Sequence, residues 1–190
     1  MKILGLDSSG IVASVAIVED ENLIAEYTVN YKKTHSQTLL PMLDELVKMT
    51  ELDLDTIDAI AVAAGPGSFT GLRIGSATAK GLGLALKKPL VEIPTVDALA
   101  YNLYDSRALI CPIMDARRSQ VYTGIYRFQE HKLVTVEAQM AVPMAEMIEK
   151  LNARGEEVVF LGDGVPVFGK MIQENLKVPY SFAPAHVNKQ

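Results

Sequence analysis

The 190-residue sequence has few of the residues on which several kinds of function depend. Its single cysteine, Cys111, excludes an internal disulfide and fits a reducing compartment. It has no tryptophan, 6% aromatic residues and a net charge of −5, which argues against a protein that binds nucleic acid by charge alone. No apolar run of the sequence reaches the ~18 residues of a membrane-spanning helix. We therefore expect a globular protein of the cytoplasm.

Histidine is also scarce, and this bears on metal chemistry. The three histidines, His35, His131 and His186, lie far apart in the sequence. A helical metal-binding pair that begins at His35 would need a second histidine at Leu39. The nucleophile-elbow pattern G-x-S-x-G is missing as well. We predict no metal site, no catalytic residue and no bound cofactor.

The order of the predicted elements repeats once along the chain. Three β-like runs, a helical pattern and a buried strand occupy 2–7, 11–18, 23–30, 35–49 and 57–64. The same order follows at 108–115, 119–128, 132–138, 143–153 and 157–161. A duplicated β-β-β-α-β(-α) unit is the plan of the actin-like ATPase superfamily, so we predict an α/β protein with this ribonuclease H-like fold. Its domains would be 1–104 and 105–190. Many single α+β domains also place three strands before a helix, and that alternative stays open.

The first strand of each predicted domain ends in an aspartate, where this superfamily binds nucleotide. The first loop, Asp7-Ser8-Ser9-Gly10, keeps hydroxyl groups and a glycine, whereas Asp115-Ala116-Arg117-Arg118-Ser119 has no glycine. Two arginines thus stand where small residues would let the backbone approach phosphate. We interpret the residues as a degenerate nucleotide site; they are Asp7, Ser8, Ser9, Asp115 and Arg117. The alternative is an active ATPase or phosphotransferase that holds Mg-ATP with Asp7 and Asp115.

The stretch AGPGSFTGLRIGSATAKGLGLA, residues 64–85, raises the same question of phosphate binding. Both glycine-rich phosphate motifs fail at Thr70, and Pro66 lacks an N–H donor. The spacing predicts a helix over 70–86 that is capped by Ser68 or Thr70. A ridge with a spacing of four residues follows its length and would let another helix approach closely; it comprises Gly71, Gly75, Ala79 and Gly83.

The helix predicted over 35–49 has more apolar surface than one sheet requires. Its main stripe consists of Leu39, Met42, Leu43 and Leu46. The surplus could face the glycine-containing helix or a partner chain. A core that lies wholly within the chain is equally compatible with this pattern.

Four segments resemble the TsaB (YeaZ) family. They are LGLDSS at 4–9, HSQTLLPMLDEL at 35–46, AGPGSFTGLRIG at 64–75 and MDARRSQVYTGIY at 114–126. The resemblance implies a non-catalytic subunit that binds the catalytic subunit TsaD and works with the ATPase TsaE. Together they transfer a threonylcarbamoyl group to N6 of the adenosine beside the anticodon in tRNA. It also implies homodimers in isolation and contact with tRNA only through the complex. Because the family is grouped with glycoprotease-like proteins, a metallopeptidase is a further alternative. The lack of a second histidine near His35 in the sequence disfavours it.

The resemblance also carries a partner interface onto the two helices. The expected interface residues are His35, Leu39, Met42, Leu43, Leu46, Thr70, Gly71, Ile74, Gly75, Thr78 and Leu82. We expect Gly75→Leu or Leu43→Glu to abolish partner binding and leave the monomer folded. Family members continue into a further helix beyond FAPAHVNKQ, so we expect the second domain to be short of its last helix.

Overall fold

The computed structural model describes residues 1–31 and 34–188, which form two compact units. Unit 1 comprises Met1–Thr95, and unit 2 begins at Val96. The division predicted between residues 104 and 105 falls after helix α3 (Thr95–Tyr101), whereas the compact units divide at the start of this helix. Residues 189 and 190 of the predicted second domain lie outside the described residues.

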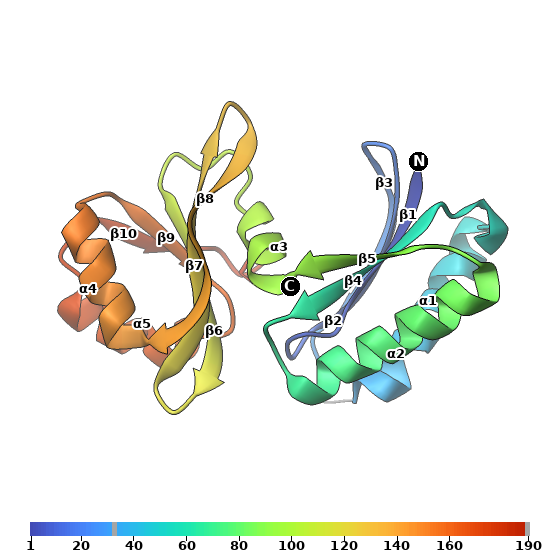
Figure 1. The fold of residues 1–190 in the computed structure, drawn as a ribbon, viewed down its shortest axis with the longest axis horizontal. Helices are drawn as coiled ribbons and strands as arrows, with labels where there is room; N and C mark the ends of the chain where they lie inside the picture. The colour runs from blue at the N-terminus through green and yellow to red at the C-terminus, as the bar shows by residue number, and fades with distance from the viewer. Residues whose placement is uncertain (32–33, 189–190) are drawn as a thin grey trace. The chain divides into compact units, whose positions relative to one another are not determined.

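Unit 1 is a five-stranded sheet with two long helices on one face (Figure 1). Its elements are β1 (Lys2–Asp7), β2 (Ala13–Glu19), β3 (Asn22–Val29), α1 (His35–Thr50), a 3-10 turn η1 (Leu54–Thr56), β4 (Ala59–Gly65), α2 (Phe69–Leu86) and β5 (Leu90–Pro94). The strand order is β3-β2-β1-β4-β5, with β1, β4 and β5 parallel and β2 antiparallel to its neighbours. The predicted order of three strands, a helix and a strand is confirmed.

The core of unit 1 follows from the sequence patterns of its elements. In β2 every second residue, Ala13, Val15 and Ile17, is buried, as expected for a strand with one covered face. Helix α1 buries its predicted stripe against this face of the sheet, and the stripe comprises Leu39, Met42, Leu43 and Leu46. The main stripe of α1 therefore belongs to the internal core.

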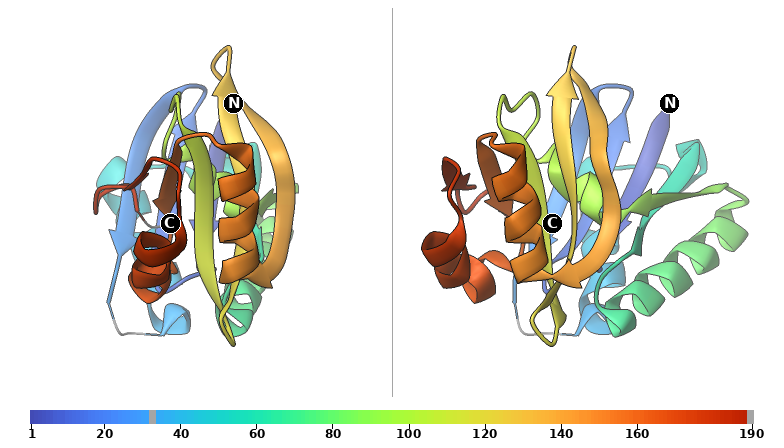
Figure 2. Two further views of the ribbon diagram at one scale, coloured as in Figure 1. Left: turned by 90° about the vertical axis from the view of Figure 1, so that its left-hand side faces the viewer. Right: turned by 60° about the vertical axis from the view of Figure 1, so that its left-hand side comes forward.

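Unit 2 repeats this arrangement after α3. Its further elements are β6 (Leu109–Arg117), β7 (Gln120–Gln129), β8 (Lys132–Pro143), α4 (Met144–Arg154), β9 (Val158–Leu161), α5 (Val165–Asn175) and β10 (Tyr180–Phe182). The strand order β10-β9-β6-β7-β8 is equivalent to that of unit 1. Helices α4 and α5 cover one face of the sheet, and α3 packs on the other (Figure 2).

Helix α5 was not expected from the sequence, which indicated no helix after β9. Residues 165–175 form this helix, which begins with Pro166 in its first turn and buries Phe168 and Ile172. It lies before FAPAHVNKQ, so it is a different helix from the one expected to be missing beyond that segment. Unit 2 therefore has the complete order of three strands, helix, strand and helix.

Two glycine-containing loops show the duplication in backbone detail. Gly65 ends β4 and Gly162 follows β9, and both have a φ of +107°. A Cβ on Gly67 would lie under 3.0 Å from Ser9 O in the loop after β1, and a Cβ on Gly164 would lie 2.8 Å from Ile113 O within β6. Because a side chain fits neither place, the same strand-to-helix connection requires glycine in both units.

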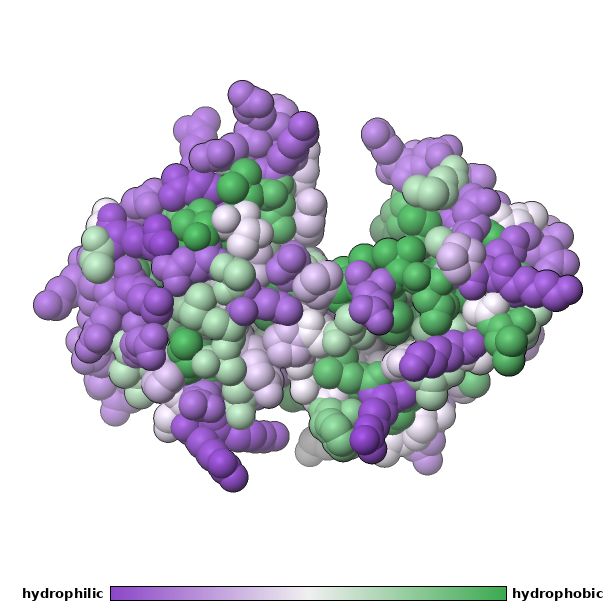
Figure 3. Space-filling model, viewed as in Figure 1, coloured by the Kyte–Doolittle hydropathy of each residue, from purple (hydrophilic) through white to green (hydrophobic). Residues whose placement is uncertain are grey.

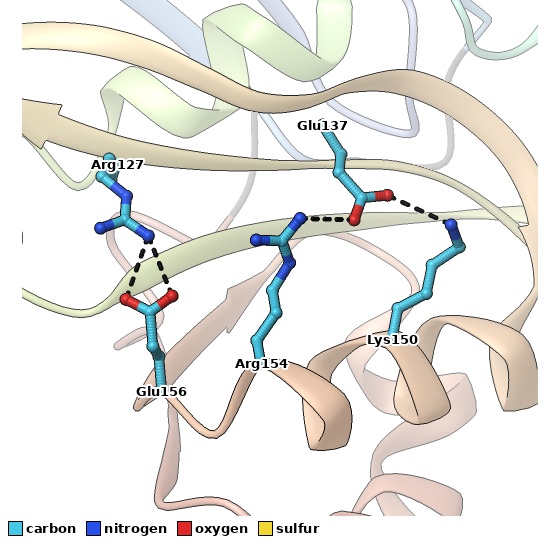
Figure 4. Close-up of polar contacts among 5 residues, drawn as sticks. All are labelled: Arg127, Glu137, Lys150, Arg154 and Glu156. Atoms are coloured by element: carbon cyan, nitrogen blue, oxygen red, sulfur yellow. Dashed lines mark hydrogen bonds and ion pairs between the residues drawn. The ribbon is translucent and has the colours of Figure 1, made fainter.

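Ion pairs fasten α4 to the sheet of unit 2 (Figure 4). Glu137 on β8 accepts from Arg154 Nη2 at 2.7 Å and from Lys150 Nζ at 3.3 Å. These hydrogen bonds hold the pKa of Glu137 below its usual range, Arg154 having the largest effect. Arg127 on β7 donates to both carboxylate oxygens of Glu156 at 3.0 Å.

Candidate partner interface

The glycine ridge of α2 packs inside unit 1. Gly71, Gly75, Ala79 and Gly83 are the buried residues of this helix. Ser8, which follows β1, donates its hydroxyl to Gly71 O at 2.9 Å, and a Cβ on Gly75 would lie 2.6 Å from Ser8 Oγ. The loop after β1 thus approaches Gly71 and Gly75 closely, whereas Gly83 faces Leu90. The prediction that the ridge holds another helix is wrong, although the close approach that it implied is present.

The start of α2 is fixed by the same loop. Ser68 is the N-cap, and its side chain accepts a hydrogen bond from Gly71 N at 3.3 Å, which confirms one of the two predicted caps. The N–H of Ser68 donates to Ser9 O at 2.6 Å. These contacts hold the first turn of α2 against the end of β1.

The predicted interface residues divide into two sets. The first set is buried within unit 1 and comprises Leu39, Met42, Leu43, Leu46, Gly71 and Gly75. The second set is half-buried or exposed and comprises His35, Thr70, Ile74, Thr78 and Leu82. Residues of the first set pack against their own sheet and loop, so Leu43→Glu and Gly75→Leu would disrupt the fold. We correct the expectation that these two variants leave the monomer folded.

A second stripe on α2 faces solvent. It has the alternating spacing of four and three residues that is typical of helix–helix contacts, and it contains no charge. We name it the outer stripe; its residues are Thr70, Ile74, Ala77, Gly81 and Leu84. Leu84 is 84% exposed, and a Cβ on Gly81 would meet no atom within 4 Å. In the space-filling view, hydrophobic residues gather on the visible side of α2 between hydrophilic side chains (Figure 3).

The sequence analysis missed three members of the outer stripe, Ala77, Gly81 and Leu84. The signal for them was the repeat of 3.5 residues, which the more prominent glycine ridge obscured. Neighbouring residues define the limits of the stripe. Arg73, whose guanidinium carbon lies 4.0 Å from the ring centroid of Phe69, and Lys80 are exposed on one flank of α2. Helix α1 packs beside α2 and has an exposed leucine of its own, Leu40.

The candidate nucleotide residues of unit 1 are held by one another. Asp7 Oδ1 accepts from Ser9 N at 2.7 Å and from Ser9 Oγ at 2.6 Å. Burial raises the pKa of Asp7, and the two hydrogen bonds from Ser9 oppose this rise. His35 Nε2 lies 2.9 Å from Gly10 O and joins the start of α1 to the same loop. In this arrangement Asp7 orders the loop against which α2 packs.

The candidate nucleotide residues of unit 2 form a tight turn. Arg117 N donates to Asp115 Oδ1 at 2.9 Å, and Arg117 Nη1 lies 3.3 Å from Asp115 Oδ2. Arg117, Arg118 and Ser119 have φ values of 68°, 52° and 60°. A non-glycine residue pays about 1 kcal/mol or more for this left-handed conformation. The turn thus places Asp115 in contact with an arginine, at a cost in backbone strain.

Residues 1–31 and 34–188 contain no group of three or more histidine, cysteine, aspartate or glutamate side chains that could hold a metal ion. No helix in these ranges has both the length and the hydrophobicity needed to span a membrane.

Comparison with known proteins identifies the family. The family model described as TsaD, tRNA N6-adenosine threonylcarbamoyltransferase, matches residues 22–189. The TsaB protein of Bacillus subtilis (strain 168) is 36% identical over 93% of this chain and 77% of its own length. The chain belongs to the TsaB group of the TsaD family. The TsaB protein of Escherichia coli (strain K12) is 30% identical over 86% of this chain and 72% of its own length.

Solved structures confirm the fold. YeaZ from Pseudomonas aeruginosa matches with a TM-score of 0.83 at 26% identity, over 99% of this chain and 86% of its own. EutJ from Carboxydothermus hydrogenoformans, at 14% identity, has a TM-score of 0.55 and supports the fold alone. The predicted duplicated fold of the actin-like ATPase type is confirmed, and the TsaB group is the family that the four sequence segments indicated.

Proposed function

We propose that this chain is a non-catalytic subunit in the biosynthesis of threonylcarbamoyladenosine in tRNA. Its relatives are named as proteins of this pathway, and the matching family model is that of the threonylcarbamoyltransferase. The chain binds a TsaD-type catalytic subunit, and the pair works with a TsaE-type ATPase. Two copies of the chain pair through the same surface when the partner is absent. Because tRNA is modified in the cytoplasm, we place the protein there.

The observation that carries this proposal is the outer stripe of α2. A helix in a monomer normally presents charged or polar residues to solvent. The outer stripe instead presents the apolar residues Ile74, Ala77 and Leu84. It also contains Gly81, and the packing of unit 1 gives no reason for a glycine at this position. Glycine in a helix costs about 1 kcal/mol relative to alanine, so a close helix–helix contact offers the missing explanation.

The proposal of a non-catalytic role rests on the contacts of Asp7 and Asp115. Asp7 is engaged by Ser9 and Asp115 by Arg117, each within its own unit. We infer that both serve the local structure and that nucleotide chemistry belongs to the partner.

A transfer assay tests this function. The purified chain is combined with TsaD-type and TsaE-type proteins, ATP, the threonylcarbamoyl donor and unmodified tRNA. We expect transfer to require the chain, to persist with Asp7→Asn and to fall at least tenfold with Leu84→Glu at limiting protein concentration. Loss of transfer with Asp7→Asn, in a chain that still binds its partner, would favour the active phosphotransferase instead.

A further inference from the structure

The turn between β6 and β7 places two arginines in a backbone conformation that favours glycine. The strand pairing ends at Arg117 and Gln120, so Arg118 and Ser119 are the two central residues of the turn. Both have positive φ, and Asn-Gly is the pair that meets this geometry at the least cost. The chain has Arg-Ser there, with a third left-handed residue, Arg117, before it.

Although backbone hydrogen bonds support the turn, the side chains of the two arginines make few contacts within unit 2. The side chain of Arg117 is 86% exposed in its ion pair with Asp115, and ion pairs so exposed add little to stability. Arg118 is exposed and makes no hydrogen bond or ion pair within the described part of unit 2. The packing of unit 2 therefore gives no reason for the two guanidinium groups at this turn.

A second turn of the same unit provides an internal comparison. Glu130 and His131 join β7 to β8 between the paired residues Gln129 and Lys132, and both have positive φ. Here the histidine is partnered, with Nδ1 3.0 Å from Asp105 Oδ2. The two turns share their backbone conformation and differ in charge, because one carries two arginines and the other a glutamate.

We propose that Arg117 and Arg118 bind phosphate groups of an RNA backbone, so that this chain contacts tRNA directly within the complex. The inference rests on the proposed function, which supplies the tRNA. A guanidinium group matches the oxygens of a phosphate with two parallel hydrogen bonds, and the turn places two such groups on adjacent residues. Because the chain carries a net charge of −5, the contact orients a tRNA that the complex holds. It revises the expectation that tRNA is contacted only through the partner.

The test uses the complex of this chain with its TsaD-type partner and a fluorescein-labelled, unmodified tRNA transcript. Fluorescence anisotropy gives the Kd at several salt concentrations for a variant with Arg117→Gln, Arg118→Asn and Ser119→Gly. Each lost phosphate contact lowers the dependence of log K on log salt by about 0.9, so we expect a slope smaller by about 2 and a Kd about tenfold higher at 0.1 M salt.

The matched control carries Glu130→Asn and His131→Gly. Both variants place Asn-Gly at their turn, so both should keep or raise the melting temperature. The control should keep the wild-type Kd within about twofold, since phosphate binding gains nothing from a glutamate. An unchanged Kd in the arginine variant, or an equal loss in the control, would overturn the proposal.

Sedimentation of the same samples separates this proposal from the proposed function. If the wild-type chain and the partner form no complex, the proposed function fails, and the titration is repeated with the isolated chain. A tenfold difference in Kd between the isolated wild-type chain and its arginine variant would still support phosphate binding by Arg117 and Arg118. A wild-type chain that binds no tRNA in either form would overturn it.

Discussion

Replacement of Gly71 by alanine should destabilise unit 1, although alanine is the better helix former. Propensity alone would favour the variant by about 1 kcal/mol. Against this, the new Cβ would lie under 3.0 Å from Ser8 O and 3.3 Å from Ser68 Cβ. Overpacking of this kind costs about 1–3 kcal/mol, and a shift of the loop also weakens the buried hydrogen bond from Ser8 Oγ to Gly71 O, worth about 1 kcal/mol. We expect a net loss of about 2 kcal/mol.

Gly81→Ala is the matched control on the same helix. A Cβ there meets nothing within 4 Å, so the propensity gain of about 1 kcal/mol should appear in full. Hydrogen exchange of the full chain, read by mass spectrometry on peptides of β1 and α2, measures both changes within unit 1. If Gly71→Ala were as stable as Gly81→Ala, the packing of α2 against the loop after β1 would be wrong.

Three further predictions concern buried and charged groups. Leu43→Glu should unfold unit 1, because Leu43 is only 4% exposed and a buried unpaired carboxylate costs about 4 kcal/mol or more; native-like circular dichroism would contradict this. The lowered pKa of Glu137 means that its ionised form stabilises unit 2 at pH values above the pKa of the unfolded chain, and this contribution is lost as pH falls through the lowered value. Glu137→Gln should therefore cost about 1 kcal/mol of stability at neutral pH and nothing in acid. Melting temperatures of wild type and variant at both pH values would show this difference. The raised pKa of Asp7 has the opposite effect on stability, because ionisation of this carboxyl above the unfolded pKa weakens the fold. Asp7→Asn should therefore be more stable than the wild type at neutral pH and equal to it in acid. A variant that is less stable than the wild type at both pH values would refute burial as the cause of the raised pKa.

The sequence predicted those elements that have a clear period or boundary. The alternation of β2, the stripe of α1 and the repeated order of elements are properties of neighbouring residues, and all three are present in the structure. Strand β5 and helix α3 were not assigned, since five and seven residues are too few for a period to emerge. Helix α5 was missed although Pro166, Phe168 and Ile172 carried a start signal and a spacing of four.

The candidate site shows a different limit. The spacing of Gly71, Gly75 and Gly83 identifies a smooth face of a helix, but it does not identify what covers that face. Here Ser8 covers Gly71 and Gly75, from a position 63 residues earlier in the chain than Gly71, and Leu90 covers Gly83. Only the fold shows that the ridge is internal and that the outer stripe remains available to a partner.

The most direct test of the account is the affinity of this chain for a TsaD-type partner, measured by sedimentation velocity with wild type and two variants. Ala77→Glu with Leu84→Glu changes only the exposed outer stripe, and Val167→Glu changes another exposed apolar residue, on α5 in unit 2, as the control. Loss of contacts central to an interface costs about 2 kcal/mol or more, so the stripe variant should bind at least about thirtyfold more weakly. Val167→Glu should bind as the wild type does. Wild-type affinity in the folded stripe variant would contradict the central claim that this chain acts by docking α2 against a catalytic partner.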